Sequence, residues 1–166
     1  MDMLVNLYHL PKVTPLIDRL HGEGVEIKRA LAPDKTNVLD FIKQHFNQGW
    51  ADECEAAFAN QPVSCYIAVR DHRIIGFACH EATARGFFGP TGLSEEERGK
   101  DIGTALLLCC LNAMRELGYG YAAIGWCDGA MEFYRKAAGA IPIPDSFPGV
   151  YSRLASVEIP EGENAL

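Results

Sequence analysis

The stretch Leu93-Ser94-Glu95-Glu96-Glu97-Arg98-Gly99-Lys100-Asp101-Ile102-Gly103-Thr104-Ala105 decides the fold. It follows a strand-like run and opens a long amphipathic helix, so the first turn of that helix leaves backbone N–H groups without partners. Two glycines and two cationic side chains, Arg98 and Lys100, converge on this turn. Free N–H groups at the positive end of a helix dipole favour an anion, and basic side chains add charge-assisted hydrogen bonds. The stretch therefore predicts a phosphate site.

Neither of the two commonest phosphate loops is present in this stretch. The Lys-Ser/Thr ending of a Walker A loop is missing, and no G-x-G-x-x-G occurs. A capping box formed by Ser94 and Glu97 at a plain helix start would explain the acidic residues, but not the basic residues or the second glycine. We interpret the acidic run 95–97 as a solvated face.

The composition excludes several classes of protein. With 166 residues, of which 48% are hydrophobic, the chain has the length of one domain that buries a sizeable core. A formal net charge of −7 argues against a nucleic-acid binder and is compatible with a cationic amine substrate. The first residues lack a basic flank and no stretch approaches transmembrane length, so we expect a cytoplasmic protein that is not bound to a membrane.

Six cysteines are scattered along the chain without a C-x-x-C pair or a histidine at zinc spacing. Their spacing predicts neither a disulfide framework nor a metal site. We expect buried, reduced thiols, as in a cytosolic protein. These residues are Cys54, Cys65, Cys79, Cys109, Cys110 and Cys127.

Hydrophobic patterning predicts the secondary structure. We expect strands at 3–10, 25–31, 64–70, 73–83, 86–94, 119–126, 141–143 and 150–157, and an irregular helix within 11–24. Helical spacing of apolar residues predicts further helices around 38–46 and 50–58, and at 102–117 and 129–138. Asp71 and His72 form a hairpin turn. The glycines and proline within 89–92 predict a bulge or splay in the strand 86–94.

The order of these elements predicts the fold class. No repeat, low-complexity block or long linker divides the chain, so we expect one domain over residues 1–166. An N-terminal extension over about 1–23 and a frayed acidic tail over about 160–166 complete it. A hairpin, a strand-helix-strand crossover and a final helix and strand predict an α/β (α+β) fold, with a mixed, mostly antiparallel central sheet and flanking helices.

Two motifs resemble those of the GNAT superfamily of acyl-CoA-dependent N-acetyltransferases. The family's pyrophosphate loop reads Arg/Gln-x-x-Gly-x-Gly/Ala, and it falls on Arg98, Asp101 and Gly103, with Asp101 in a position that is usually glycine. The segment 130–140 resembles the second motif, in which an alanine, a tyrosine, a glycine and a phenylalanine occur in this order with other residues between the first three. Here Tyr134 takes the tyrosine position and Ala140 the phenylalanine position. The order of elements is also that of the GNAT fold.

The resemblance implies an activity and the residues that carry it. It implies an enzyme that transfers an acetyl group from acetyl-CoA directly to the primary amine of a small molecule or peptide, without a metal. Family members often form dimers, so the resemblance leaves a homodimer open. The backbone of Leu93 would pair with the pantetheine arm, and Tyr134 would protonate the departing thiolate. The pyrophosphate would be wrapped by Arg98, Gly99, Lys100, Asp101, Ile102, Gly103 and Thr104.

A general base is also required, because an ammonium group has no lone pair. A lysine-like amine is neutral in only about one molecule in a few thousand at neutral pH. We predict Glu81 as the base, followed by His80 and Asp128, since Glu81 shares strand parity with Phe77 and Cys79. Glu81 as a solvated carboxylate at a strand end stays open, as does Tyr134 as a core aromatic on an amphipathic helix.

Asp101 leaves two other functions open. A carboxylate at the mouth of a phosphate site repels the ligand unless its side chain turns outward, although Asp tolerates unusual backbone angles better than most residues. The chain could therefore be a non-catalytic acyl-CoA-binding or interaction module with the same fold. A different nucleotide at the same helix start is the third hypothesis.

Overall fold

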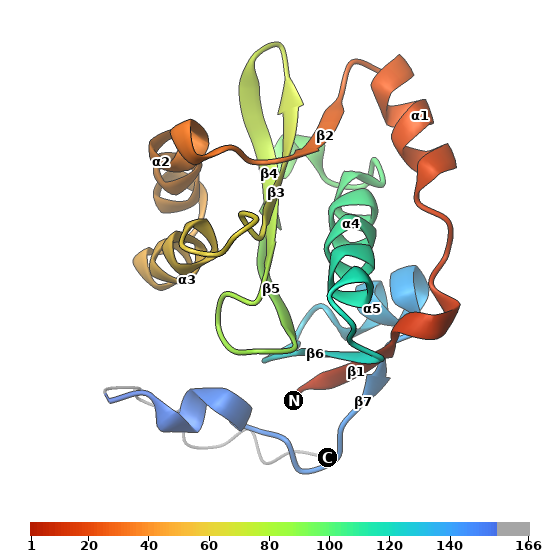
Figure 1. Ribbon diagram of the computed structural model, residues 1–166, viewed down its shortest axis with the longest axis vertical. Coiled ribbons are helices and arrows are strands. Elements are labelled where there is room, and N and C mark those ends of the chain that lie inside the picture. The colour runs from red at the N-terminus through yellow and green to blue at the C-terminus, as the bar shows by residue number, and fades with distance from the viewer. Residues whose placement is uncertain (156–166) are drawn as a thin grey trace.

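A seven-stranded sheet forms the centre of the molecule (Figure 1). The structure is a computed structural model and describes residues 1–155. The strands follow the order β2-β3-β4-β5-β6-β1-β7, and every neighbouring pair is antiparallel except β5 and β6. This confirms the predicted mixed, mostly antiparallel sheet. The strands are β1 (Met3–Asn6), β2 (Glu26–Arg29), β3 (Cys65–Arg70), β4 (Arg73–His80), β5 (Phe87–Leu93), β6 (Tyr121–Ile124) and β7 (Ile141–Pro142).

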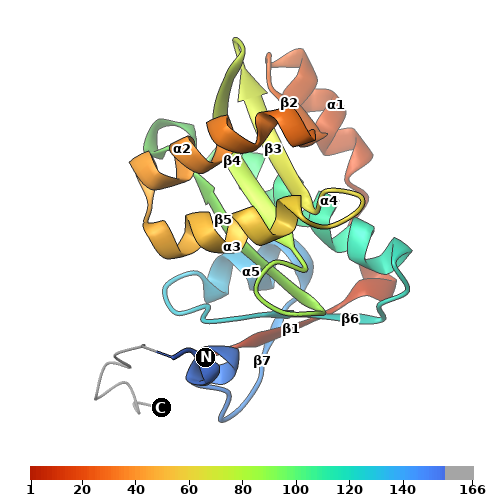
Figure 2. The same ribbon diagram turned by 60° about the vertical axis from the view of Figure 1, so that its left-hand side comes forward.

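Helices cover both faces of the sheet (Figures 1 and 2). On one face lie α2 (Lys35–His45) and α3 (Gln48–Phe58), and on the other α1 (Thr14–Gly22), α4 (Ile102–Glu116) and α5 (Met131–Ala138). Short 3-10 helices occur at Leu7–His9, Ala32–Asp34, Glu95–Glu97 and Gly149–Arg153. None of the helices described has the length and apolarity that a bilayer-spanning segment needs.

Local sequence signals account for several boundaries of these elements. Asp71 and His72 join β3 to β4 and have positive φ angles of 49° and 60°, as a two-residue type I′ hairpin turn requires. Gly139 ends α5 in the left-handed conformation with φ 65°. The side chain of Asn47 accepts a hydrogen bond from the backbone N–H of Trp50 and so begins α3. The hairpin and the stop of α5 were predicted from the sequence.

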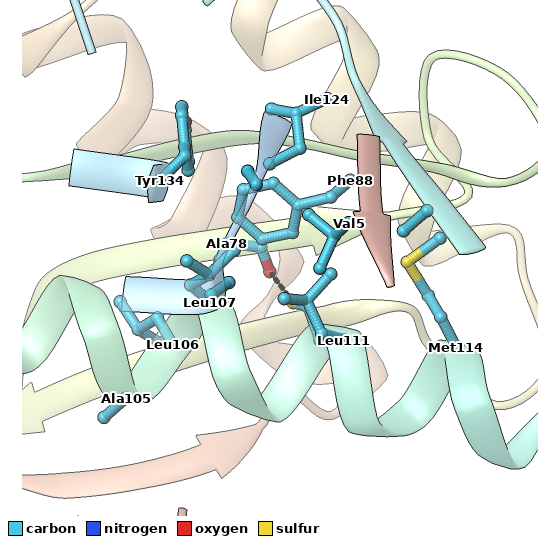
Figure 3. Close-up of a cluster of buried hydrophobic side chains, with 14 of the residues drawn as sticks. Val5, Ala78, Phe88, Ala105, Leu106, Leu107, Leu111, Met114, Ile124 and Tyr134 are labelled. Atoms are coloured by element: carbon cyan, nitrogen blue, oxygen red, sulfur yellow. Dashed lines mark hydrogen bonds between the residues drawn. The ribbon is translucent and has the colours of Figure 1, made fainter. Parts of the chain in front are cut away.

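Two apolar clusters hold the layers together, one on each face of the sheet. The larger cluster lies between α4 and the sheet, and most of α4 is buried. Figure 3 shows its side chains reaching the sheet, with Tyr134 and Phe88 in the same cluster. Of the predicted apolar stripe on this helix, only Leu117 is exposed, because it lies just beyond the last turn. The α4 residues labelled in the figure are Ala105, Leu106, Leu107, Leu111 and Met114.

Pairing between β5 and β6 is short. Only Phe87 with Ala123 and Phe88 with Ile124 are in register. Beyond Phe88, β5 remains paired with β4 up to Leu93, while β6 runs away from it at a steep angle (Figure 1). The predicted splay is confirmed, and one edge of residues 89–93 is left without a strand partner within the described chain.

The first residues belong to the sheet. β1 lies between β6 and β7, with Met3 opposite Ile124 on one side and Pro142 on the other. α1 packs beside α4. The segment expected as an N-terminal extension thus supplies a strand inside the sheet, next to the edge strand β7, and a covering helix.

The predicted strand at 150–157 is wrong over the residues that the structure describes. Residues Gly149–Arg153 form a 3-10 helix, in which the hydroxyl of Ser152 donates a hydrogen bond to the carbonyl of Gly149 over 2.8 Å. The ring of Tyr151 packs edge-on against Trp126, so its burial comes from an aromatic cluster and not from a strand ladder. The expected frayed tail, about 160–166, lies outside the described residues.

The cluster under α4 should dominate stability. Leu111 is fully buried, so Leu111→Ala should lower the free energy of unfolding by about 2–5 kcal/mol through lost transfer energy and a cavity. Urea denaturation measures this change. Leu117→Ala is the matched control, since this leucine is 57% exposed and should change stability by no more than about 0.5 kcal/mol. Equal effects of the two substitutions would contradict the assignment of the core.

Candidate active site

The turn between β5 and α4 presents a row of unused backbone N–H groups. Within residues 1–155, no acceptor is found for the N–H groups of residues 99–104, and the first ladder bond runs from Ala105 N–H to the carbonyl of Asp101 over 3.0 Å. Gly99 and Asp101 have positive φ angles of 75° and 63°. Such a turn at the start of a 15-residue helix has the donors and the dipole that an anion requires.

A cavity of about 550 Å³ lies beside this turn. Gly92 forms part of its wall, and a Cβ atom there would overlap the ring of Phe46, so the glycine lets the end of α2 pack onto β5. The cavity continues past α5 to Tyr134. The predicted cofactor residues that line it are Leu93, Arg98, Gly99, Asp101, Gly103 and Thr104.

The other two predicted cofactor residues are turned elsewhere. The ammonium of Lys100 lies 3.0 Å from the carboxylate of Glu97, which also pairs with Arg70 at 3.2 Å. Glu97 is buried, so the predicted solvated face is wrong at this residue, because two cations compensate its charge. The side chain of Ile102 is fully buried in the core, which leaves only its backbone N–H available.

The carboxylate of Asp101 points toward α1. Its Oδ2 atom accepts a hydrogen bond from Arg19 Nη2 at 2.7 Å, and the pair is exposed to solvent. The arginine reduces the negative charge at the mouth of the anion site. The backbone N–H of Asp101 stays available, although the side chain departs from the usual glycine.

Tyr134 lies at the inner end of the cavity. The residue is 7% exposed, and its ring packs against Phe88 and Phe133 with centroid distances of 6.1 and 5.1 Å. No described residue hydrogen-bonds its hydroxyl. Burial raises the pKa of the phenol, so the hydroxyl stays protonated across the physiological range.

A second cavity, of about 460 Å³, meets the first at Tyr134, Trp50 and Thr91, which line both. It extends between the diverging strands, with Trp126 and Tyr151 in its wall. Glu53 on α3 is the one carboxylate among the described residues that line this cavity. Its Oε2 atom accepts a hydrogen bond from the hydroxyl of Thr83 at 2.9 Å. Burial raises the pKa of this carboxyl group.

The structure does not bring the predicted bases to Tyr134. Glu81 accepts hydrogen bonds from the N–H of Gly86 at 2.6 Å and the hydroxyl of Tyr119 at 3.0 Å, and thereby fixes the turn before β5. It lines a different cavity together with His80, which is buried and whose pKa burial lowers to about 4. Asp128 lines neither of the two cavities that share Tyr134.

Comparison with known families agrees with this geometry. Residues 27–140 match the model of the acetyltransferase (GNAT) family, a range that includes Tyr134 and the turn 99–104, here called the anion-binding turn for the predicted phosphate site. The chain belongs to the GNAT family. Among curated proteins, no match is found.

Solved GNAT structures share the fold at low sequence identity. The GCN5-related glucosamine N-acetyltransferase region of a fungal multi-domain β-N-acetylglucosaminidase superposes with a TM-score of 0.65 at 17% identity, over 82% of this chain and 19% of that one. A GCN5-related N-acetyltransferase from Sphaerobacter thermophilus gives 0.64 at 18%, over 84% and 47%. A GNAT family acetyltransferase from Brucella melitensis, solved with acetyl-CoA, gives 0.53 at 17%, over 68% and 80%. This chain spans less than half the length of the first two.

Sequence reasoning missed Glu53 in this GNAT chain. The signal was nevertheless present, because Glu53 lies three residues after Trp50 and directly before the buried Cys54, at the flank of the apolar stripe of α3. The sequence alone does not show that Glu53 lines the same cavity as Tyr134, which lies 81 residues further along the chain.

Asp101→Gly should tighten coenzyme A binding by about 2- to 5-fold, because a negative charge leaves the helix N-terminus and glycine accepts the positive φ without strain. Arg19→Met should weaken binding by a similar factor, since it leaves the carboxylate unpaired. Titration calorimetry with coenzyme A measures both. Asp18→Asn, on the same helix, is the control, and identical affinities for all four proteins would contradict the charge argument.

Proposed function

We propose that this GNAT protein transfers an acetyl group from acetyl-CoA to the primary amine of a small molecule or peptide by direct attack in a ternary complex. One observation supports this most strongly: the cavity beside the anion-binding turn and the cavity that holds Glu53 meet at Tyr134. Two reactants can therefore approach one phenol from opposite sides. The acetyl-CoA complex of the Brucella melitensis relative supports the choice of co-substrate.

Acetyl-CoA would occupy the larger cavity. Its pyrophosphate would accept hydrogen bonds from the N–H groups of residues 99–104, with Arg98 adding charge. The pantetheine arm would lie along β5 at Leu93, where the strand has no partner on the side of β6. A strand amide near Leu93 would polarise the thioester carbonyl.

The amine would occupy the smaller cavity, beside Glu53. An aromatic wall of Trp50, Trp126 and Tyr151 with one carboxylate suits an ammonium group, which aromatic faces and a carboxylate both attract. Glu53 then takes the proton that the amine must lose, and its raised pKa makes it a stronger base than an exposed carboxylate. Glu53 replaces Glu81 in this role.

In the proposed reaction, the acetyl group moves from the sulfur of acetyl-CoA to the nitrogen of the amine. After Glu53 has released the first proton to solvent, the neutral amine nitrogen forms a bond to the thioester carbon and gives its second proton to Glu53, the carbon–sulfur bond breaks, and the sulfur leaves as a thiolate. Tyr134 gives its proton to that sulfur and regains one from solvent. A thiol has an ordinary pKa of about 8.5, below that of a phenol, and burial in the same apolar cavity disfavours both the free thiolate and the phenolate, so the transfer depends on Tyr134 lying beside the leaving sulfur.

A non-catalytic acyl-CoA-binding module is the second candidate, and the acid at position 101 favours it. Release of coenzyme A thiol from acetyl-CoA in the presence of a panel of primary amines separates the two functions. Amine-dependent thiol release supports the enzyme, whereas tight binding without any release supports the module.

Tyr134→Phe should lower kcat by about 10²- to 10⁴-fold, because the leaving sulfur loses its proton donor. The affinity for coenzyme A should stay within about twofold, since the ring and its packing remain. Steady-state thiol release and calorimetry measure these two quantities. Tyr8→Phe, at a residue that is 66% exposed, is the control. Unchanged turnover in Tyr134→Phe would remove this residue from the reaction.

Glu53→Gln should lower kcat/KM for amines by about 10²-fold or more and leave coenzyme A binding unchanged. The pH profile supplies the sharper test. Because burial raises the pKa of Glu53, activity should be lost as the pH falls through that raised value. The glutamine variant should lack this loss of activity on the acidic side of the pH profile. Glu55→Gln, an exposed neighbour on α3 that pairs with Lys35, should behave as the unmodified protein. Parallel pH profiles for Glu53→Gln and the unmodified protein would exclude Glu53 as the base.

A further inference from the structure

Three cysteine thiols from α3, β3 and β4 meet in the core, on the face of the sheet that α3 covers. The Sγ atoms of Cys54, Cys65 and Cys79 all lie within 4.8 Å of one another, and those of Cys54 and Cys65 are 3.9 Å apart. Cys65 and Cys79 are directly opposite each other in the β3–β4 ladder, so both side chains leave the sheet on the same face. All three residues are fully buried.

The surroundings of this trithiol are apolar. Its neighbours in the cluster include Ala51, Ala57 and Phe77. Within residues 1–155, no histidine, aspartate or glutamate joins the three sulfur atoms. Among the described side chains of these types, an ion held there has the three sulfur atoms as its donors.

Coordination number and charge together select the ion. Structural zinc takes four ligands, so three sulfurs in an apolar core leave it one short. Coordinated thiols are deprotonated, and three thiolates carry three negative charges. A monovalent or divalent ion would leave net negative charge buried without a partner, which is costly. A trivalent ion that keeps a lone pair is fully coordinated by three thiolates and gives a neutral product.

We propose that Cys54, Cys65 and Cys79 form a binding site for a trivalent thiophilic metalloid, for which arsenous acid is the probe. Three arsenic–sulfur bonds form, three arsenic–oxygen bonds break, and the three thiol protons leave with the hydroxyl groups as three waters. No electron is transferred, and neither reactant nor product carries a charge into the core.

Access to the three thiols limits the rate of binding. Since the sulfur atoms are buried, the ligand reaches them only when α3 moves away from the sheet, and binding should be slow.

Native mass spectrometry of the whole chain with sodium arsenite tests the site, with a phosphine in place of dithiol reductants, which would compete for arsenic. We expect a mass gain of one arsenic atom less three hydrogens. X-ray absorption at the arsenic edge should show three sulfur neighbours and no oxygen. Cys54→Ala should lose this adduct, and at most an arsenic that retains a hydroxyl group on two thiols should form. Cys127→Ala, at a buried cysteine outside the trithiol, should keep it.

Several outcomes would overturn the inference: no adduct after prolonged incubation, an oxygen neighbour in the unmodified chain, or a three-sulfur adduct that survives in Cys54→Ala. Displacement of arsenic by zinc at equal concentration would refute the argument from charge and coordination. If Cys54→Ala does not fold, the absorption spectrum of the unmodified chain still decides. None of these measurements uses acetyl transfer, so the inference stands or falls separately from the proposed function.

Discussion

The incomplete pairing of β5 with β6 is the constraint on which the site depends. The two strands are in register at only two positions, and both cavities open where they part. A continued ladder would cover the edge of β5 with hydrogen bonds. The divergence is tolerated because β4 holds the other edge of β5 and α4 packs beneath it. Since α4 follows β5 after one short 3-10 helix, its free N–H groups lie beside the same opening.

Part of the site lies outside the region that matches the family. That region begins at residue 27, whereas Arg19, which pairs with Asp101, lies on α1. The departure from the usual glycine is thus compensated by a helix that the family model does not cover. The same N-terminal segment supplies β1, which pairs with β6 and holds it on the far side of the opening. α1 therefore contributes Arg19 to the candidate anion site, and β1 holds the strand that borders the opening.

The sequence predicts those features that depend on neighbours close in the chain. The β3–β4 hairpin and the helix start at residue 102 have local signals, and the structure places both where expected. Tyr134 also has a local signal, and it lines the cavity beside the turn before α4. Glu81 lines a different cavity from Tyr134, because the strand parity of Phe77 and Cys79 does not extend across a register shift between Ala78 and His80. The shift, followed by a positive φ of 57° at Glu81, turns the carboxylate toward Gly86.

Features that depend on the packing of distant elements escape sequence analysis. The cysteines of the trithiol come from three elements, and their spacing in the sequence resembles no metal motif. Glu53 and Tyr134 line one cavity because α3 lies over the opening between β5 and β6. Glu53 and Cys54 are consecutive residues of α3, and one lies in each site: Cys54 faces the sheet in the trithiol, while Glu53 lines the cavity. One helical residue turns the side chain by about 100°, so whatever fixes Cys54 also fixes the direction of Glu53.

Burial acts on the two proposed catalytic groups in complementary ways. It raises the pKa of Glu53, which makes the carboxylate a better acceptor for the proton of an amine. It also raises the pKa of Tyr134, which keeps the phenol protonated but makes it a weaker acid. The second effect is a disadvantage only while the leaving thiolate is well solvated. Inside the same apolar cavity the thiolate becomes more basic as well, because desolvation disfavours every anion there. Exclusion of water from the junction at Tyr134 thus favours proton transfer from the ammonium group to Glu53, whereas in the transfer from Tyr134 to sulfur it raises the pKa of both partners.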